Sequence, residues 1–283
     1  MDMRFLYGYV FIICLVVNSI CADRIGEGYQ HIECTVVPFD HEEGPYSYPY
    51  IPGPEALTIK ALKNQVTSTN WGGYVAANSL SKPSKNSVTA VYGSWIVPLI
   101  MSSDHDGYSA YWVGIDGYSS STVEQIGTSH NCINGVQQNY AWFEMYPGPS
   151  YGINGFPLAP GDVISASIEY KGNYIFSMTL YNNTQKTYTT IPTTYTTSKT
   201  ALRQCVEWIV EAPYMNGILP LSDFVTAYMW GCIATINGVT GVINTHNWDC
   251  APIVMVASNG TPKATVSPLL HDNGSFFMEW MSA

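Results

Sequence analysis

Several short runs of this 283-residue chain mix acidic and aromatic side chains, which together could form a site for acid–base chemistry. Successive side chains of a β-strand point to opposite faces, so every second residue shares a face. The run at 140–146 then puts Glu144 beside Trp142, and the run at 206–211 puts Glu207 beside Glu211, away from the apolar residues. If the runs share one sheet, a single face carries aromatic rings and a set of polar groups: Asp116, Gln125, Glu144, Glu207 and Glu211.

Such a face has two interpretations. Only 11% of the residues are charged, so several acids gathered among aromatic rings indicate a functional site. The same alternation also describes the ordinary solvated face of an antiparallel sheet. The pattern alone leaves both open.

The elements that would position these residues are strands. From residue 71 onward, apolar and polar residues alternate in about a dozen runs separated by Gly, Pro, Asn and Ser, which predicts an all-β sandwich or barrel. The Thr-rich stretch at 187–200 is β-prone, and we expect it to form a hairpin. The main predicted strands lie at 88–97, 108–115, 139–146, 163–170, 174–181, 205–211, 224–236 and 253–257.

Other chemistries are absent from the sequence. It has no HExxH zinc helix, no GxSxG nucleophile elbow and no Asp-Thr-Gly or Asp-Ser-Gly loop. We therefore expect no metal and no cofactor. The net charge of −10, from 21 acidic and 11 basic residues, offers no basic surface for a nucleic acid.

The N-terminus has the features of a targeting segment. Arg4 precedes an apolar run at 5–17 that is short for a membrane span, so residues 1–22 are predicted to be a signal peptide. Residues 23–66 are rich in proline and are expected to be a pro-segment or a flexible N-terminal extension, leaving one domain at 67–283. After signal removal we expect no membrane association and a secreted monomer.

Two further features agree with export. Sequons mark Asn182, Asn259 and Asn273 as candidates for glycosylation. Five cysteines follow the signal peptide, and removal of Cys34 with a pro-segment would leave four that could form disulfides.

A series of motifs resembles the glutamic peptidases, or eqolisins. The matching motifs occur in the family's order: NWGGYV at 70–75, GSWIVP at 93–98, YWVGIDG at 111–117, EQIG at 124–127, AWFEMYP at 141–147, PGD at 160–162 and VEWIVE at 206–211. Met145 departs from the family, which often has Trp there. Ile126 departs too, because a small polar residue is common at that position. These departures bear on subsite preference more than on the chemistry.

The resemblance implies a secreted acid endopeptidase on a lectin-like sandwich of two antiparallel sheets, made as a precursor and acting on polypeptides. It assigns Gln125 and Glu211 as the catalytic pair. The predicted substrate-binding or supporting residues are Trp71, Trp112, Asp116, Glu144 and Glu207.

The expected mechanism uses a water and forms no covalent intermediate. Glu211 takes a proton from the water and later gives it to the leaving amine, while the Gln125 amide stabilises the oxyanion. A free Glu titrates near pH 4.3, so such a base stays partly ionised at about pH 3–4. We also expect greater stability in acid than at neutral pH.

Two alternatives remain at this stage. Paired carboxylates on a β-sandwich also suit a secreted glycoside hydrolase. The chain could instead be a non-catalytic, lectin-like binding module.

Overall fold

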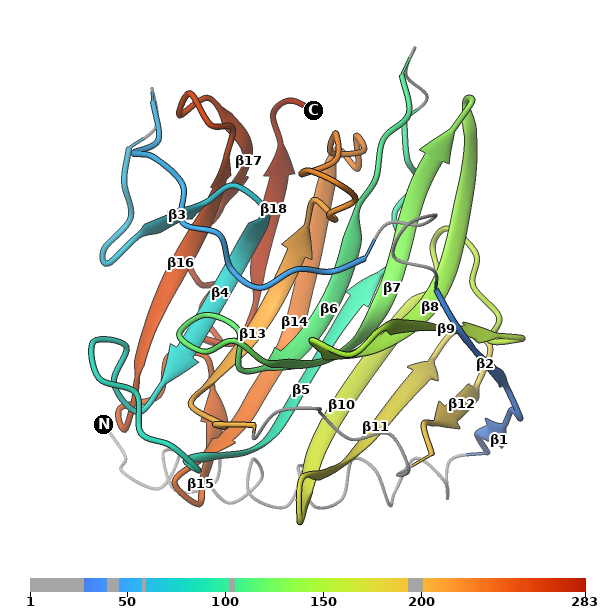
Figure 1. The fold of residues 1–283 in the computed structure, drawn as a ribbon, viewed down its shortest axis with the longest axis horizontal. Helices are drawn as coiled ribbons and strands as arrows, with labels where there is room; N and C mark the ends of the chain where they lie inside the picture. Colours follow the sequence, from blue (N-terminus) through green and yellow to red (C-terminus); the bar gives the residue numbers. More distant parts are fainter. Residues whose placement is uncertain (1–27, 40–45, 58–59, 102–104, 193–200) are drawn as a thin grey trace, which may run out of the picture.

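The computed structural model describes residues 28–39, 46–57, 60–101, 105–192 and 201–283, and all regular structure in them is β (Figure 1). The predicted signal peptide lies outside the described residues. The strands are β1 (Gln30–His31), β2 (Thr35–Pro38), β3 (Val66–Ser68), β4 (Trp71–Ala77), β5 (Val88–Ile96), β6 (Ala110–Ile115), β7 (Val123–Ile133), β8 (Val136–Tyr146), β9 (Ser150–Asn154), β10 (Val163–Gly172), β11 (Ile175–Asn182), β12 (Thr187–Thr190), β13 (Cys205–Glu211), β14 (Thr226–Ile236), β15 (Val239–Val242), β16 (Asp249–Val256), β17 (Pro262–Val266) and β18 (Phe276–Trp280).

The strands form two packed layers, which confirms the predicted all-β sandwich. The first, called here the site layer, has the order β16–β4–β13–β6–β7–β8–β9–β2. The second, called the opposite layer, has the order β18–β14–β5–β10–β11–β12–β1. Strand β17 pairs with both β16 and β18, so hydrogen bonding continues around one edge of the sandwich.

Alternation along the strands sorts the side chains as predicted. The residues expected to point inward, such as Tyr111, Phe143 and Trp208, lie in the core between the layers and are fully buried. Trp112, Trp142 and Ile209 belong to a second apolar cluster on the other face of the site layer. Burial of large apolar side chains is the main stabilising term of such a sandwich.

The predicted strand at 205–211 matches β13 end to end, whereas β7 is longer than the short run seen in the sequence. The Thr-rich stretch begins as β12, which pairs with the preceding β11. The residues that would complete the expected hairpin, 193–200, lie outside the described residues.

The N-terminal extension is attached to both layers. Strand β1 pairs in parallel with β12, and β2 pairs with β9. Residues 46–57, blue in Figure 1, cross the site layer over β13 and β6. This part of the extension is therefore packed on the domain, which its proline content had not suggested.

The structure also bears on the cysteine and sequon predictions. All five described cysteines are free, so the expected pairing is not found among them. Asn259 and Asn273 are exposed. Asn182 is fully buried and its Nδ2 donates to Pro157 O (3.0 Å) and to Asp162 (2.7 Å). A glycan attached to that nitrogen would replace one of its two N–H donors and would have to fit inside the protein, so this fold disfavours glycosylation of Asn182.

Candidate active site

The register of the site layer places the predicted residues on one outward face. On neighbouring strands Gln125 is directly opposite both Gly114 and Glu144, and Gly114 is in turn opposite Glu207. Glu211 lies on the same face, opposite Ala110 and four residues after Glu207 along β13. The small residues of β6 leave room between the larger side chains of β13 and β7.

Gln125 and Glu211 meet at one oxygen atom. The Ser47 hydroxyl is 3.0 Å from Gln125 Oε1 and is also hydrogen bonded to Glu211 Oε2. All three side chains are buried. The side chains of two residues that are 86 positions apart thus converge on a single hydroxyl.

Glu211 is surrounded by hydrogen-bond donors. Trp112 Nε1 donates to Oε2 at 2.8 Å, and the Tyr48 amide donates to Oε1 at 2.9 Å. The Asn70 amide lies 3.4 Å from Oε1. The Trp112 ring lies so close to Gly114 that a Cβ atom added at residue 114 would be 2.6 Å from the ring.

Burial raises the pKa of Glu211 to about 7, although the surrounding donors favour the ionised form and limit the rise. This corrects the expectation that Glu211 keeps an ordinary pKa. In the intact chain the carboxyl is covered by residues 46–51 and is mainly protonated in acid.

Glu144 orients the amide of Gln125. Gln125 Nε2 donates to Glu144 Oε2 at 3.1 Å, which leaves Oε1 facing Ser47. Burial, together with the nearby Glu211 carboxyl, holds the pKa of Glu144 well above its ordinary value. Since a primary amide has two N–H donors, the second N–H of Gln125 is not used by Glu144.

Asp116 and Glu207 lie on the same face but take no part in the contacts around Ser47. Asp116 accepts the backbone amides of Arg203 (2.6 Å) and Gln204 (2.8 Å), which fixes the chain just before β13 begins. Burial, reinforced by the nearby Asp116, raises the pKa of Glu207 well above its ordinary value. For Asp116 and Glu207, this geometry favours the predicted supporting role over direct contact with a substrate.

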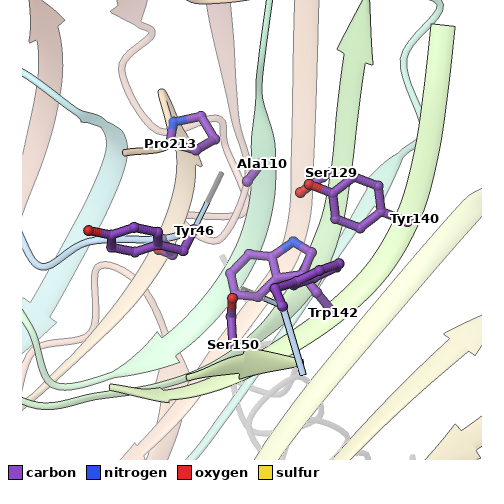
Figure 2. Close-up of a pocket in the computed structure, with 9 residues that line it drawn as sticks. Tyr46, Ala110, Ser129, Tyr140, Trp142, Ser150 and Pro213 are labelled. Carbon is purple, nitrogen blue, oxygen red and sulfur yellow. The ribbon is translucent and has the colours of Figure 1, made fainter. Parts of the chain in front are cut away.

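Aromatic rings line both sides of the pair. The rings of Trp71 and Trp112 meet edge to face with centroids 4.9 Å apart. Figure 2 shows a small pocket bounded by Tyr46, Tyr140, Trp142 and Pro213, next to Ser47. The sequence had placed Trp142 on this face without assigning it a role.

Sequence reasoning missed Ser47 and Tyr48, which contact the predicted pair Gln125 and Glu211. The local sequence Tyr-Ser-Tyr-Pro-Tyr has no catalytic signature, and only the path of the chain reveals these contacts. Among the described residues, no three His, Cys, Asp or Glu side chains are grouped so that they could hold a metal ion. The described residues also include no helix with the length and apolar character of a membrane span.

The chain is similar to known peptidases in family and in fold. The Peptidase A4 family matches residues 69–274, which is most of the chain. No match was found among curated proteins. In fold the chain is similar to scytalido-glutamic peptidase solved with a transition state analog inhibitor, with a TM-score of 0.61 and 21% identity over 75% of this chain and 98% of that one. It is also similar to aspergilloglutamic peptidase from Aspergillus niger, with a TM-score of 0.52 and 22% identity over 62% of this chain and 99% of that one.

The family match displaces the two alternatives, a glycoside hydrolase and a lectin-like module. The chain belongs to the peptidase A4 family, the eqolisins, and is a glutamic endopeptidase.

Proposed function

We propose that this protein is a secreted acid endopeptidase in which Glu211 and Gln125 hydrolyse peptide bonds by activating a water. The observation that carries the proposal is the convergence of both side chains on the Ser47 hydroxyl. Oxygen in a hydroxyl and in water has similar size and hydrogen-bonding capacity, so this position suits an attacking water once residues 46–51 have left.

The chemistry divides between the two residues. Ionised Glu211 removes a proton from the water as its oxygen attacks the scissile carbonyl. The N–H of Gln125 that Glu144 does not use donates to the developing oxyanion, and Gln125 Oε1 helps to hold the water. Glu211 then gives its proton to the leaving nitrogen, so no covalent intermediate forms.

Acid pH suits this division of roles between Glu211 and Gln125, because a Gln side chain does not titrate, whereas a histidine in its place would be fully charged. The pKa of about 7 applies to Glu211 beneath residues 46–51. Exposure of the carboxyl to water removes much of the desolvation and lowers its pKa towards the ordinary value. The enzyme then has an ionised base at moderately acid pH.

The apolar run at residues 5–17 supports export, with the protein acting outside the cell or in an acidic compartment of the secretory pathway. We propose polypeptides as its substrates.

The test is digestion of denatured casein by the full chain after incubation at pH 4. We expect peptides from the wild type and none from Glu211→Gln. Intact-mass measurement during turnover should find no acyl-enzyme. A wild type that leaves casein intact over the whole range from pH 2 to 6, or full activity in Glu211→Gln, would overturn the proposal.

A further inference from the structure

Residues 46–51, called here the strap, cross the catalytic pair in an extended conformation. At one end Tyr46 and Tyr214 exchange two backbone hydrogen bonds, of 3.1 and 2.8 Å, as in a short antiparallel sheet. Tyr214 follows β13, the strand that carries Glu211. A bound peptide is commonly held by this kind of strand addition.

The other end of the strap is held through backbone groups as well. The Tyr48 carbonyl accepts from Trp71 Nε1 at 2.9 Å and from Asn70 Nδ2 at 3.0 Å. The Ile51 amide donates to Asn70 Oδ1 at 3.0 Å. Recognition of the main chain on both sides of the pair is what a peptidase requires of a substrate, whatever its side chains.

The peptide bond between Ser47 and Tyr48 lies directly at the catalytic pair. Its nitrogen, the Tyr48 amide, is 2.9 Å from Glu211 Oε1, where a leaving amine would receive a proton. Its carbonyl carbon is one bond away, about 1.33 Å from that nitrogen. The Ser47 hydroxyl occupies the point shared by Gln125 and Glu211, where the attacking water would lie.

We infer that the strap lies in the substrate path as a bound substrate analogue, and that it resists cleavage because the Ser47 hydroxyl takes the place of the attacking water. This inference rests on the proposed function. It makes residues 46–51 an internal inhibitor of the intact chain. It also assigns Asn70, Trp71 and the Tyr214 backbone as residues that bind substrate main chain.

The strap also indicates which side chains the cleft accepts after the scissile bond. The Tyr48 ring stacks on Tyr214 with centroids 4.8 Å apart and meets the Tyr146 ring edge-on at 5.6 Å. Aromatic pairs of this kind stabilise a complex beyond simple burial. The structure thus favours substrates with an aromatic residue directly after the cleaved bond.

Removal of the Ser47 hydroxyl converts the strap into a substrate. In Ser47→Ala a water can enter between Gln125 and Glu211. Its oxygen bonds to the carbonyl carbon of residue 47, the bond to the Tyr48 nitrogen breaks, and Glu211 passes the water's proton to that nitrogen. The products are a carboxyl group at residue 47 and a free amine on Tyr48.

The experiment follows cleavage between residues 47 and 48 by mass spectrometry after a rapid shift of the full chain to pH 4. We expect Ser47→Ala to be cut there at least about tenfold faster than the wild type, a change of roughly 1.4 kcal/mol in the barrier. Ser47→Thr keeps the hydroxyl and should stay resistant. Ser81→Ala, on an exposed loop, is the matched control. Glu211→Gln combined with Ser47→Ala should abolish the cut.

Equal rates at this bond in the wild type, Ser47→Thr and Ser47→Ala would overturn the inference. A second measurement does not depend on catalysis: hydrogen exchange of the wild type at pH 6.5. Protection of the Tyr46, Tyr48 and Ile51 amides supports the strap, and exchange at unfolded rates overturns it, even if Ser47→Ala fails to fold. Protected amides in the wild type, together with failure of both the wild type and Ser47→Ala to digest casein, would reject the proposed function while keeping the position of the strap.

Discussion

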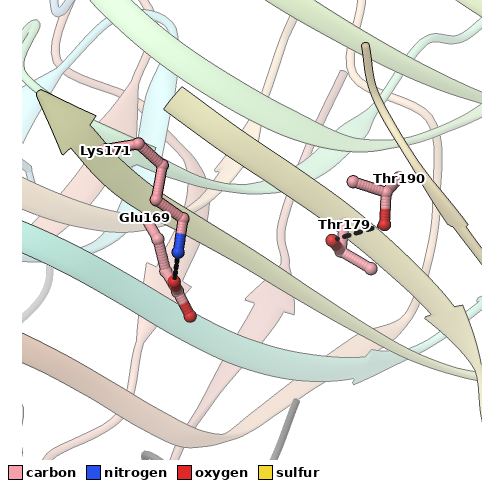
Figure 3. Close-up of polar contacts among 4 residues, drawn as sticks. All are labelled: Glu169, Lys171, Thr179 and Thr190. Atoms are coloured by element: carbon pink, nitrogen blue, oxygen red, sulfur yellow. Dashed lines mark hydrogen bonds and ion pairs between the residues drawn. The ribbon is translucent and has the colours of Figure 1, made fainter. Parts of the chain in front are cut away.

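The two layers of the sandwich carry glutamates on their outward faces, and the surroundings of these glutamates differ. On β10 of the opposite layer, Glu169 is 37% exposed and forms an ion pair with Lys171, which is 49% exposed (Figure 3). Nearby Thr179 and Thr190 are hydrogen bonded at 3.0 Å. On the site layer, Glu211 is fully buried beneath the strap.

Strand alternation turns both glutamates outward, so alternation does not distinguish them. The difference comes from what covers each face. Phe39, Tyr46 and Tyr50 of the N-terminal extension pack on Tyr140, Tyr214 and Trp71 of the site layer. That cover removes water from the face and raises the pKa values of the carboxyls below it, whereas Glu169 stays in contact with solvent.

The largest predicted effect separates the same substitution on the two faces. Glu211→Gln removes the group that we propose as both base and acid, and each such role contributes about 10²–10⁴-fold. We expect at least a 10⁴-fold loss in kcat/KM for casein peptides at pH 4, whereas Glu169→Gln should retain full activity. Comparable losses in both variants would contradict the assignment of the site.

The second prediction concerns the amide partner. Gln125→Ala removes one oxyanion donor, which typically costs about 10²–10³-fold in rate. Gln138, an exposed residue of the same sheet on β8, provides the matched control. Gln138→Ala should have wild-type kcat under the same acid assay, and a loss of less than tenfold in Gln125→Ala would remove the amide from the mechanism.

The third prediction is that stability decreases as pH rises. Burial raises the pKa values of five acids of the site layer: Asp116, Glu124, Glu144, Glu207 and Glu211. Acids with raised pKa values stabilise the fold when protonated, and this contribution is lost as pH rises through the folded-state pKa. For Glu211, the rise in pKa from 4.5 to about 7 lowers the free energy of unfolding at pH 7.5 by roughly 3 kcal/mol relative to acid pH.

We expect a Tm at least several degrees lower at pH 7.5 than at pH 5, measured by calorimetry in the Gln125→Ala background to prevent self-cleavage. His130 opposes this trend between about pH 6.5 and 4, because burial lowers its pKa to about 4 and the unfolded chain therefore binds its proton first, but the five acids outweigh this one group. Glu124→Gln should reduce the loss at pH 7.5, whereas Glu169→Gln should not. An equal or higher Tm at pH 7.5 would show that the buried acids do not control stability.

The smallest effect is expected on the opposite layer. Exposed ion pairs contribute about 0–1 kcal/mol because water and salt screen them. Lys171→Ala should therefore change the free energy of unfolding by less than about 1 kcal/mol and leave casein digestion unchanged. A larger loss in urea unfolding would mean that the two outward faces are less different than their exposure indicates.

Much of the fold was predictable because its signals are local. Alternation along 205–211 predicted both the limits of β13 and the separation of Trp208 in the core from Glu207 and Glu211 on the other face. The same reasoning placed Gln125 and Glu144 correctly on their strands. The raised pKa of Glu211 in the intact chain was not predictable, because burial under a distant segment leaves no mark in the residues around it.

By itself, the amino-acid sequence determined which residue types lie on which face of each strand, because the period of two is a property of the chain. Only the tertiary structure decided that β13 and β7 lie two strands apart, so that Glu211 and Gln125 share one hydroxyl. It also decided that this hydroxyl belongs to Ser47. Neither result is encoded locally, since both depend on contacts between segments about 80 to 160 positions apart, brought together by burial of apolar surface.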